Sequence, residues 1–178
     1  MIRKTLPMAN VVYLAGPEVF LPNAVEIGAE KISICNHYGL DARFPLDPAL
    51  VADGIEPAVL GHRIFERCVE LMDECGVIIA NMTPFRGISM DVGTAVEVGY
   101  MYGRGCPVFG YTNVATDYFE RVSDDGFLVE TFGFVDNLMC EGPVWRSGHE
   151  VVRTAVTGDR LLTDLTGFER CVELAAAL

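Results

Sequence analysis

The sequence predicts an α/β fold in which a doubly wound parallel sheet carries helices on both faces. Short apolar segments without polar alternation alternate along the chain with longer segments of helical periodicity. Uninterrupted apolar runs of this kind are typical of parallel strands that are covered on both faces. The chain has 178 residues, 51% of them hydrophobic, which is enough for one core and short for two, so we expect a single domain over residues 1–178.

Four strands are expected, at residues 11–15, 41–45, 76–80 and 107–111. The first, VVYLA, is rich in strand-forming residues and ends at Gly16-Pro17, which is a strong turn signal. The third, GVIIA, is wholly apolar and ends at Asn81. Both therefore indicate strands buried in the middle of a sheet.

Four helices are expected, at residues 23–37, 57–75, 91–101 and 166–178. The second has the strongest apolar stripe and carries Pro57 in its first turn. Glycines follow two of these helices, Gly39 after the first and Gly103 and Gly105 after the third, and are expected to end them. Thr166 and Glu169 have the spacing of a capping box at the start of the last helix.

Successive strand-helix-strand units with right-handed crossovers favour a Rossmann-like or flavodoxin-like sheet, whose ligands bind beyond the carboxyl ends of the strands. Two segments fall outside this pattern. Residues 45–57 carry three prolines and several carboxylates, which predicts a loop that could close over a ligand. Residues 113–139 are polar with few apolar positions, which predicts an excursion from the sheet that carries lid or contact residues.

Composition excludes several classes of partner. A formal net charge of -12, from 13 Lys and Arg against 25 Asp and Glu, repels nucleic-acid backbones and anionic membranes. The N-terminal segment lacks the long apolar run of a signal peptide or membrane span. Six cysteines without a CxxC pair, and only three histidines, predict no zinc site. Reduced thiols within apolar runs indicate a cytoplasmic protein.

Residues 81–99 give the strongest indication of a functional site, because they connect the end of an expected strand to the start of an expected helix and carry two acids. Asp91 can cap that helix through its carboxylate, and Gly93 lets a ligand approach the first turn. Glu97 is the only charged residue between Asp91 and Arg104, so its carboxylate needs a partner or a function. The alternatives are a plain cap for Asp91 and a solvent-facing or ion-paired Glu97.

The expected position of Glu97 favours a functional role. A helix that follows a buried strand points its first turns toward the switch-point crevice, which Glu97 would share with Tyr13 and Gly16. A carboxylate nucleophile beside a second acid can exchange a glycosidic bond, because one group captures the sugar and the other handles the proton of the leaving group.

Several blocks of the chain, in order, resemble the nucleoside 2-deoxyribosyltransferase family. The first four are VYLAGPEVF at 12–20, IFERCVELMDECGVIIANM at 64–82, TPFRG at 83–87 and DVGTAVEVGY at 91–100. FGYTN at 109–113 and DNLM at 136–139 extend the resemblance to about residue 142, although the excursion between them is divergent.

The resemblance implies a role for each candidate residue. Glu97 would attack the anomeric carbon of the deoxyribose, Tyr13 would orient Glu97, and Asp91 would exchange a proton with the nucleobase. Gly16 and Asp47 would contact the substrate, with Asp47 close to the base. The implied substrates are deoxynucleosides and free nucleobases, and neither a cofactor nor a metal is implied.

The resemblance also implies a homo-oligomer, either a dimer or a hexamer. Asn137 and Met139 match the N-x-M segment with which, in the family, a neighbouring subunit completes the site.

At one position the chain departs from the family. Several relatives have Asn or Asp where this chain has Cys68, and that polar group helps to hold the base, so the preference between purines and pyrimidines stays open. Cys68 is expected to pack in an apolar stripe rather than to act as a nucleophile. Tyr13 has an alternative role as a core aromatic residue. Arg86 either binds a carboxylate or fixes its own loop.

Three other functions compete with transfer. An N-glycoside hydrolase would use water on a 2-deoxynucleoside or its 5′-phosphate, but Gly16-Pro17-Glu18 disfavours phosphate because the loop carries an acid rather than cationic or hydroxyl contacts. A catalytically inert nucleoside-binding sensor would keep the pocket without turnover, and the set of Tyr13, Asp91 and Glu97 argues against it. A purely structural partner protein would bind no small molecule.

Overall fold

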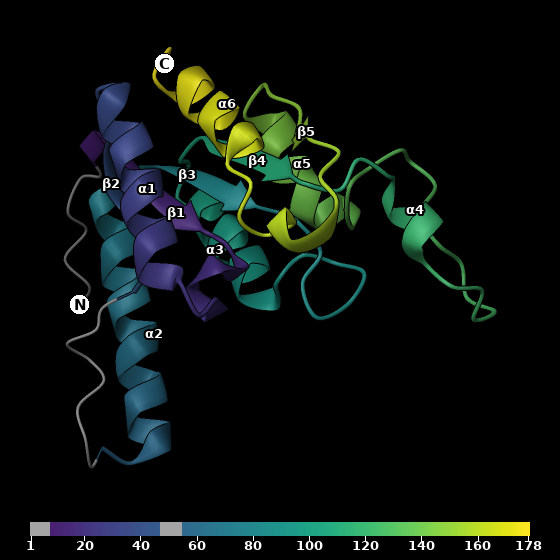
Figure 1. The fold of residues 1–178 in the computed structure, drawn as a ribbon, viewed down its shortest axis with the longest axis horizontal. Coiled ribbons are helices and arrows are strands. Elements are labelled where there is room, and N and C mark those ends of the chain that lie inside the picture. The colour runs from purple at the N-terminus through teal and green to yellow at the C-terminus, as the bar shows by residue number, and fades with distance from the viewer. Residues whose placement is uncertain (1–7, 47–54) are drawn as a thin grey trace.

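The computed structural model describes residues 8–46 and 55–178, which form one five-stranded parallel sheet covered by helices (Figure 1). The strands are β1 (Met8–Ala15), β2 (Asp41–Arg43), β3 (Cys75–Asn81), β4 (Val108–Thr112) and β5 (Val152–Arg153). Their order in the sheet is β2-β1-β3-β4-β5, and every neighbouring pair is parallel. This is the flavodoxin-like order, so the predicted fold class is confirmed.

Helices cover both faces of the sheet. They are α1 (Ala24–His37), α2 (Pro57–Glu74), α3 (Val92–Gly103), α4 (Tyr118–Arg121), α5 (Leu138–Arg146) and α6 (Thr166–Ala175), with short 3-10 turns η1 (Pro17–Phe20) and η3 (Gly158–Arg160). One face packs against α1 and α6, and the other against α2, α3 and α5. The two apolar clusters that result bury the central strands completely, as their lack of polar alternation predicted.

The pleat of β1 decides which side chains reach the site. Val12 and Leu14 point into the cluster with α1 and α6, whereas Tyr13 points to the face covered by α2 and α3. The strand therefore directs Tyr13 toward α3, the helix that carries Glu97.

Most predicted boundaries and helix ends are confirmed within two residues. Asp91 is the N-cap of α3, where its carboxylate accepts a 3.0 Å hydrogen bond from the backbone amide of Thr94. Gly39 and Gly105 follow α1 and α3 with φ of 81° and 80°, the left-handed conformation that ends helices. Pro57 lies in the first turn of α2, as expected.

Two expectations about the last third of the chain need correction. The capping box at Thr166 and Glu169 was wrong: Leu165 is the N-cap of α6, Thr166 is already helical, and Asp164 Oδ1 accepts the Thr166 amide at 3.0 Å. Helix α5 and strand β5 were not predicted. The internal Pro143 hid α5, because proline normally argues against a helix interior.

The described part of the chain contains no helix with both the length and the apolar character that a membrane crossing requires.

Candidate active site

A cavity of about 290 Å³ opens at the carboxyl end of β1, beside β3, where the strand order reverses. Four segments that lie far apart in the sequence contribute to it. Its lining residues are Gly16, Val19, Phe20, Pro45, Leu46, Ile64, Cys68, Asp91, Gly93, Thr94 and Glu97. Crevices at this position are the usual ligand sites of such sheets.

Glu97 lines this cavity and is hydrogen-bonded to Tyr13, which lies in the adjoining core and is not a lining residue. The Tyr13 hydroxyl donates a 2.6 Å hydrogen bond to Glu97 Oε1, and the Tyr13 side chain is fully buried. Burial and the carboxylate of Glu97 raise the pKa of Tyr13 far above its usual value, so the hydroxyl stays protonated and acts as a fixed donor. Tyr13 is also a core aromatic residue, which is the alternative role expected for it, so its ring packs in the core while its hydroxyl binds Glu97.

The surroundings of Glu97 shift the pKa of its carboxyl group. Burial raises the pKa of Glu97, the hydrogen bond from Tyr13 lowers it and the charge of Asp91 raises it by a smaller amount, so that the pKa is raised to about 7. No described residue forms a hydrogen bond with Oε2, the second carboxylate oxygen. A desolvated carboxylate with one oxygen held and the other uncommitted has the form that a nucleophile requires.

Asp91 contributes a second acid to the same cavity. Its Oδ2 accepts hydrogen bonds from the Thr94 amide at 3.0 Å and the Thr94 hydroxyl at 3.2 Å. The residue therefore caps α3 and also lines the cavity with Glu97. The capping role and the proposed proton-transfer role are compatible, because the cap engages only Oδ2.

Gly16 forms part of the cavity wall, and any side chain at this position would clash with its neighbours. A Cβ atom at this position would lie 1.9 Å from Glu18 Oε2 and 2.9 Å from Asn81 Cβ. Behind this wall, Glu18 Oε1 accepts hydrogen bonds from Lys31 Nζ at 2.7 Å and from the Tyr111 hydroxyl at 2.8 Å. Glu18 and Lys31 are both fully buried.

This burial corrects the argument from Glu18 against phosphate. The carboxylate of Glu18 does not face the cavity, and Lys31 neutralises it. The acid in the first loop therefore gives no information about the charge of the substrate. Lys31 lies one helical turn after Ile27 and Gly28 and one before Cys35 on the buried stripe of α1, and this spacing was the available signal for a buried cation.

Cys68 lines the cavity from α2, next to the Tyr13 and Glu97 pair. Burial and the charge of Glu97 raise the pKa of the Cys68 thiol, while the Tyr13 hydroxyl lowers it less. A thiol that stays protonated is a poor nucleophile, which supports a packing or contact role for Cys68.

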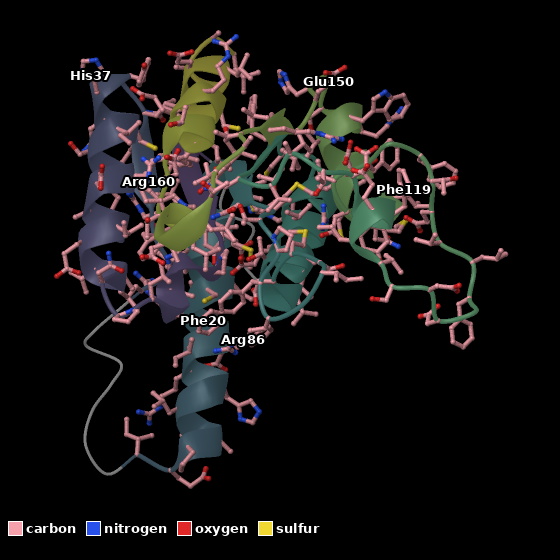
Figure 2. All side chains as sticks on the ribbon, turned by 45° about the vertical axis from the view of Figure 1, so that its right-hand side comes forward. Phe20, His37, Arg86, Phe119, Glu150 and Arg160 are labelled. Atoms are coloured by element: carbon pink, nitrogen blue, oxygen red, sulfur yellow. The ribbon has the colours of Figure 1, made fainter. Side chains whose placement is uncertain are left out.

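An aromatic and cationic cluster adjoins the cavity through Phe20, which is one of its lining residues. The rings of Phe20 and Phe85 stack with centroids 5.5 Å apart, and the Arg86 guanidinium lies 5.0 Å from the centroid of Phe20 (Figure 2). Arg86 has φ of 56°, an unfavourable backbone conformation that these ring contacts help to stabilise. Arg86 thus fixes its own loop against Phe20, one of the two roles expected for it.

Asn137 and Met139 do not line this cavity within one chain. Asn137 caps α5 by accepting the Met139 amide at 2.9 Å, and it donates to Glu130 Oε1 at 2.8 Å. Met139 is 75% exposed. Asp47 lies outside the described residues, although the adjoining Pro45 and Leu46 line the cavity.

A larger cavity of about 560 Å³ lies elsewhere, beside α5 and β5. Aromatic side chains, including Phe132 and Trp145, and the charged groups of Glu141, Glu150 and Arg153 line it. Volume alone would favour it as the site. The smaller cavity is the better candidate because Asp91 and Glu97, the partner of Tyr13, line it and because it lies at the switch point.

Among the described residues, no group of three or more His, Cys, Asp or Glu side chains has the arrangement of a metal site.

The model of the family described as nucleoside 2-deoxyribosyltransferase matches residues 12–139 of the chain. The chain belongs to this family. An uncharacterised protein of Schizosaccharomyces pombe is 34% identical over 181 aligned residues, covering 82% of this chain and 86% of its own.

Solved structures of two other proteins share the nucleoside 2-deoxyribosyltransferase fold. A 2-desoxiribosyltransferase from Leishmania mexicana has a TM-score of 0.65 and 24% identity, over 92% of this chain and 97% of its own. A 2-deoxyribosyltransferase from Bacillus psychrosaccharolyticus has a TM-score of 0.51 and 19% identity, over 75% and 82%. At these identities the two structures support the architecture rather than individual site residues.

Proposed function

We propose that this protein moves 2-deoxyribose from one nucleobase to another through a covalent intermediate on Glu97. Family membership supports the reaction class. The observation that carries the proposal for this chain is the 2.6 Å hydrogen bond from Tyr13 to Glu97, which lines a cavity together with Asp91. Nucleophile, orienting donor and second acid are thus present together.

In the first step, Glu97 Oε2 forms a bond to the anomeric carbon as the bond from that carbon to the base nitrogen breaks. The bonding electrons leave with the base, and Asp91 donates or relays the proton that makes the base a better leaving group. In the second step, a nitrogen of the incoming base attacks the anomeric carbon and Glu97 departs as a carboxylate. Asp91 regains a proton from the incoming base, and two inversions give retention.

The proposal assigns the binding roles as well. Gly16 and Asp47 contact the substrate within one chain, and Asn137 and Met139 of a neighbouring copy complete the sugar end of the site. Their position supports this, because Met139 is largely exposed and Asn137 lies outside the cavity of its own chain. Reaction in a homo-oligomer follows from this arrangement.

One assay separates the candidate functions. The protein is incubated with a deoxynucleoside and a panel of free bases, and the products are separated by chromatography. Transfer gives new deoxynucleosides. Hydrolysis gives free deoxyribose, whichever free bases are added, and an inert binder gives neither product. The proposal requires new deoxynucleosides that disappear in Glu97→Gln, and it fails if the variant still makes them.

Mixing variants tests whether the sites are shared between chains. Glu97→Gln and the double variant Asn137→Ala/Met139→Ala should each be inactive alone. In a mixed oligomer, one site combines an intact Glu97 with an intact Asn137 and Met139, so activity should return. Absence of recovery in demonstrably mixed oligomers would contradict the sharing of sites.

A further inference from the structure

One buried carboxylate connects two segments that carry residues of the proposed site. Asp136 is 1% exposed. Its Oδ2 atom accepts a 2.6 Å hydrogen bond from the backbone amide of Met90, and its Oδ1 atom accepts a 2.8 Å hydrogen bond from the backbone amide of Asn137. Met90 immediately precedes Asp91 in the sequence. Each oxygen of this one side chain therefore holds a different segment.

Arg121 forms a second connection between the same two segments. Its Nε atom donates to the carbonyl oxygen of Ile88 at 3.1 Å, and its Nη2 atom donates to the carbonyl oxygen of Val135 at 2.5 Å. Burial lowers the pKa of Arg121 and the charge of Asp136 opposes this effect, so the guanidinium and the carboxylate are close enough to interact. One anion and one cation thus join the two segments.

Both segments are irregular connections that end at the first residue of a functional helix. Residues 82–91 lead from β3 to α3, whose N-cap is Asp91, and residues 122–137 lead from α4 to α5, whose N-cap is Asn137. Buried backbone amides in such connections need acceptors, and a carboxylate is a stronger acceptor than a neutral group. The positions of both N-caps therefore depend on Asp136.

We infer that Asp136 is a positioning residue for two active sites at once. It places Asp91 at the cavity of its own chain and Asn137 at the cavity of a neighbouring copy. Both hydrogen bonds end on the same planar group, so a displacement of one segment also moves the other. The roles of Asp91 and Asn137 rest on the proposed function.

Two mixtures of inactive chains separate the two roles of Asp136. The first combines a chain that carries Asn137→Ala, Met139→Ala and Asp136→Ala with Glu97→Gln. Its only complete site lacks Asp136 beside its own Asp91. The second combines a chain that carries Asn137→Ala and Met139→Ala with a chain that carries Glu97→Gln and Asp136→Ala. Its only complete site receives Asn137 from a neighbour that lacks Asp136. Both share one reference mixture, in which Asp136 is intact.

The two mixtures should lose activity in different ways. In the first, Asp91 is misplaced for proton transfer, so kcat should fall about tenfold or more. In the second, the sugar end of the substrate is held less well, so KM should rise about threefold or more while kcat changes little. A purely structural Asp136 would reduce the number of active sites equally in both mixtures and leave KM unchanged. Native mass spectrometry counts the mixed oligomers, so kcat can be given per complete site.

The conservative variant Asp136→Asn should recover one of these two defects and not both. Asparagine has nearly the same shape as aspartate, but only its oxygen accepts a hydrogen bond while its nitrogen donates. It can therefore keep the bond from Met90 or the bond from Asn137. Recovery of both defects would overturn the inference, and so would an unchanged kcat in the first mixture or an unchanged KM in the second.

Asp164→Ala is a matched control. Asp164 Oδ1 also accepts a backbone amide, that of Thr166 at 3.0 Å, but Asp164 does not line the cavity. Its replacement should leave kcat and KM unchanged. Arg121→Lys keeps the charge beside Asp136 and loses the planar fork, so it should cause weaker forms of both defects. It replaces Asp136→Ala in both mixtures if circular dichroism shows that Asp136→Ala does not fold.

Amide hydrogen exchange, followed by NMR, tests the same connection without turnover. In Asp136→Ala the amides of Met90 and Asn137 should both exchange about fivefold or more faster than in the wild type, because each loses its acceptor. Wild-type protection at either amide would overturn the inference. A wild type that protects both amides but does not exchange bases would instead count against the proposed function.

Discussion

Tyr13 and Glu97 lie 84 residues apart in the sequence, and the hydroxyl of the first donates a 2.6 Å hydrogen bond to the second. Burial and Asp91 raise the pKa of Glu97 and this bond lowers it, and together they leave it raised to about 7. The ionised form of Glu97 is the nucleophile, so these opposing effects decide at which pH the site is competent.

The first prediction concerns the pH dependence of transfer. The rate constant kcat/KM should rise with pH through an acidic limb near 7, as Glu97 loses its proton. In Tyr13→Phe the lowering effect of the hydrogen bond is lost, so the acidic limb should move to higher pH. A limb that stays in place, or moves to lower pH, would show that Tyr13 does not stabilise the Glu97 carboxylate.

The second prediction concerns stability. The pKa of Glu97 is about 7 when folded and about 4.5 when unfolded, so between these values the folded state binds the proton more tightly. This contribution to stability is present at pH 4 and is lost as pH rises through 7. Glu97→Gln cannot ionise, so it should be more stable than the wild type by roughly 1–3 kcal/mol at pH 8.

Urea denaturation at pH 5 and pH 8 measures this difference. The advantage of Glu97→Gln should be small at pH 5 and should grow toward pH 8. An advantage that does not depend on pH would mean that the pKa of Glu97 is not raised by folding.

The third prediction separates the two roles of Asp91. Asparagine caps helices about as well as aspartate, so Asp91→Asn should change the free energy of unfolding by less than about 0.5 kcal/mol. Transfer should nevertheless fall by roughly 10²–10⁴-fold, because the amide cannot donate or accept the proton of the base. Transfer at the wild-type rate in Asp91→Asn would show that Asp91 serves only as a helix cap.

The fourth prediction concerns the buried pair behind the cavity wall. Lys31→Met leaves the Glu18 carboxylate buried without a counter-charge, which should cost about 3–5 kcal/mol of stability. The double variant Glu18→Gln/Lys31→Met should recover much of this loss, because the neutral amide can still accept the Tyr111 hydrogen bond. Thermal unfolding of the two variants checks this, and equal loss in both would argue against an electrostatic cause.

Hydrophobic periodicity and turn residues were sufficient to predict four of the five strands, the main helices and the cap at Asp91. The strands are short, apolar and bounded by turn residues, and the helices carry clear stripes. Helix α5 was missed because Gly142 and Pro143 interrupt its pattern, and β5 because two residues carry no periodic signal. Local sequence rules predict neither element, because packing stabilises them: α5 packs against β4 and α3, and β5 packs against β4 and α6.

The sequence predicted only some of the residues in and around the cavity. Glu97 was recognisable as a lone charge in an apolar helix, and its meeting with Tyr13 followed from the expected sheet topology. The inward turn of Glu18 toward Lys31 was not foreseen, because a loop acid is usually solvated. The cluster of Phe20, Phe85 and Arg86 was also missed, because its contacts join two loops without regular spacing.

The most direct test of the central claim is the mass of the intact protein after brief exposure to a deoxynucleoside without an acceptor base. The wild type should gain the mass of one deoxyribosyl group per chain, peptide mapping should place it on Glu97, and addition of a free base should remove it. Glu97→Gln should gain nothing. An unmodified wild type that nevertheless exchanges bases, or an adduct on any other residue, would contradict the account.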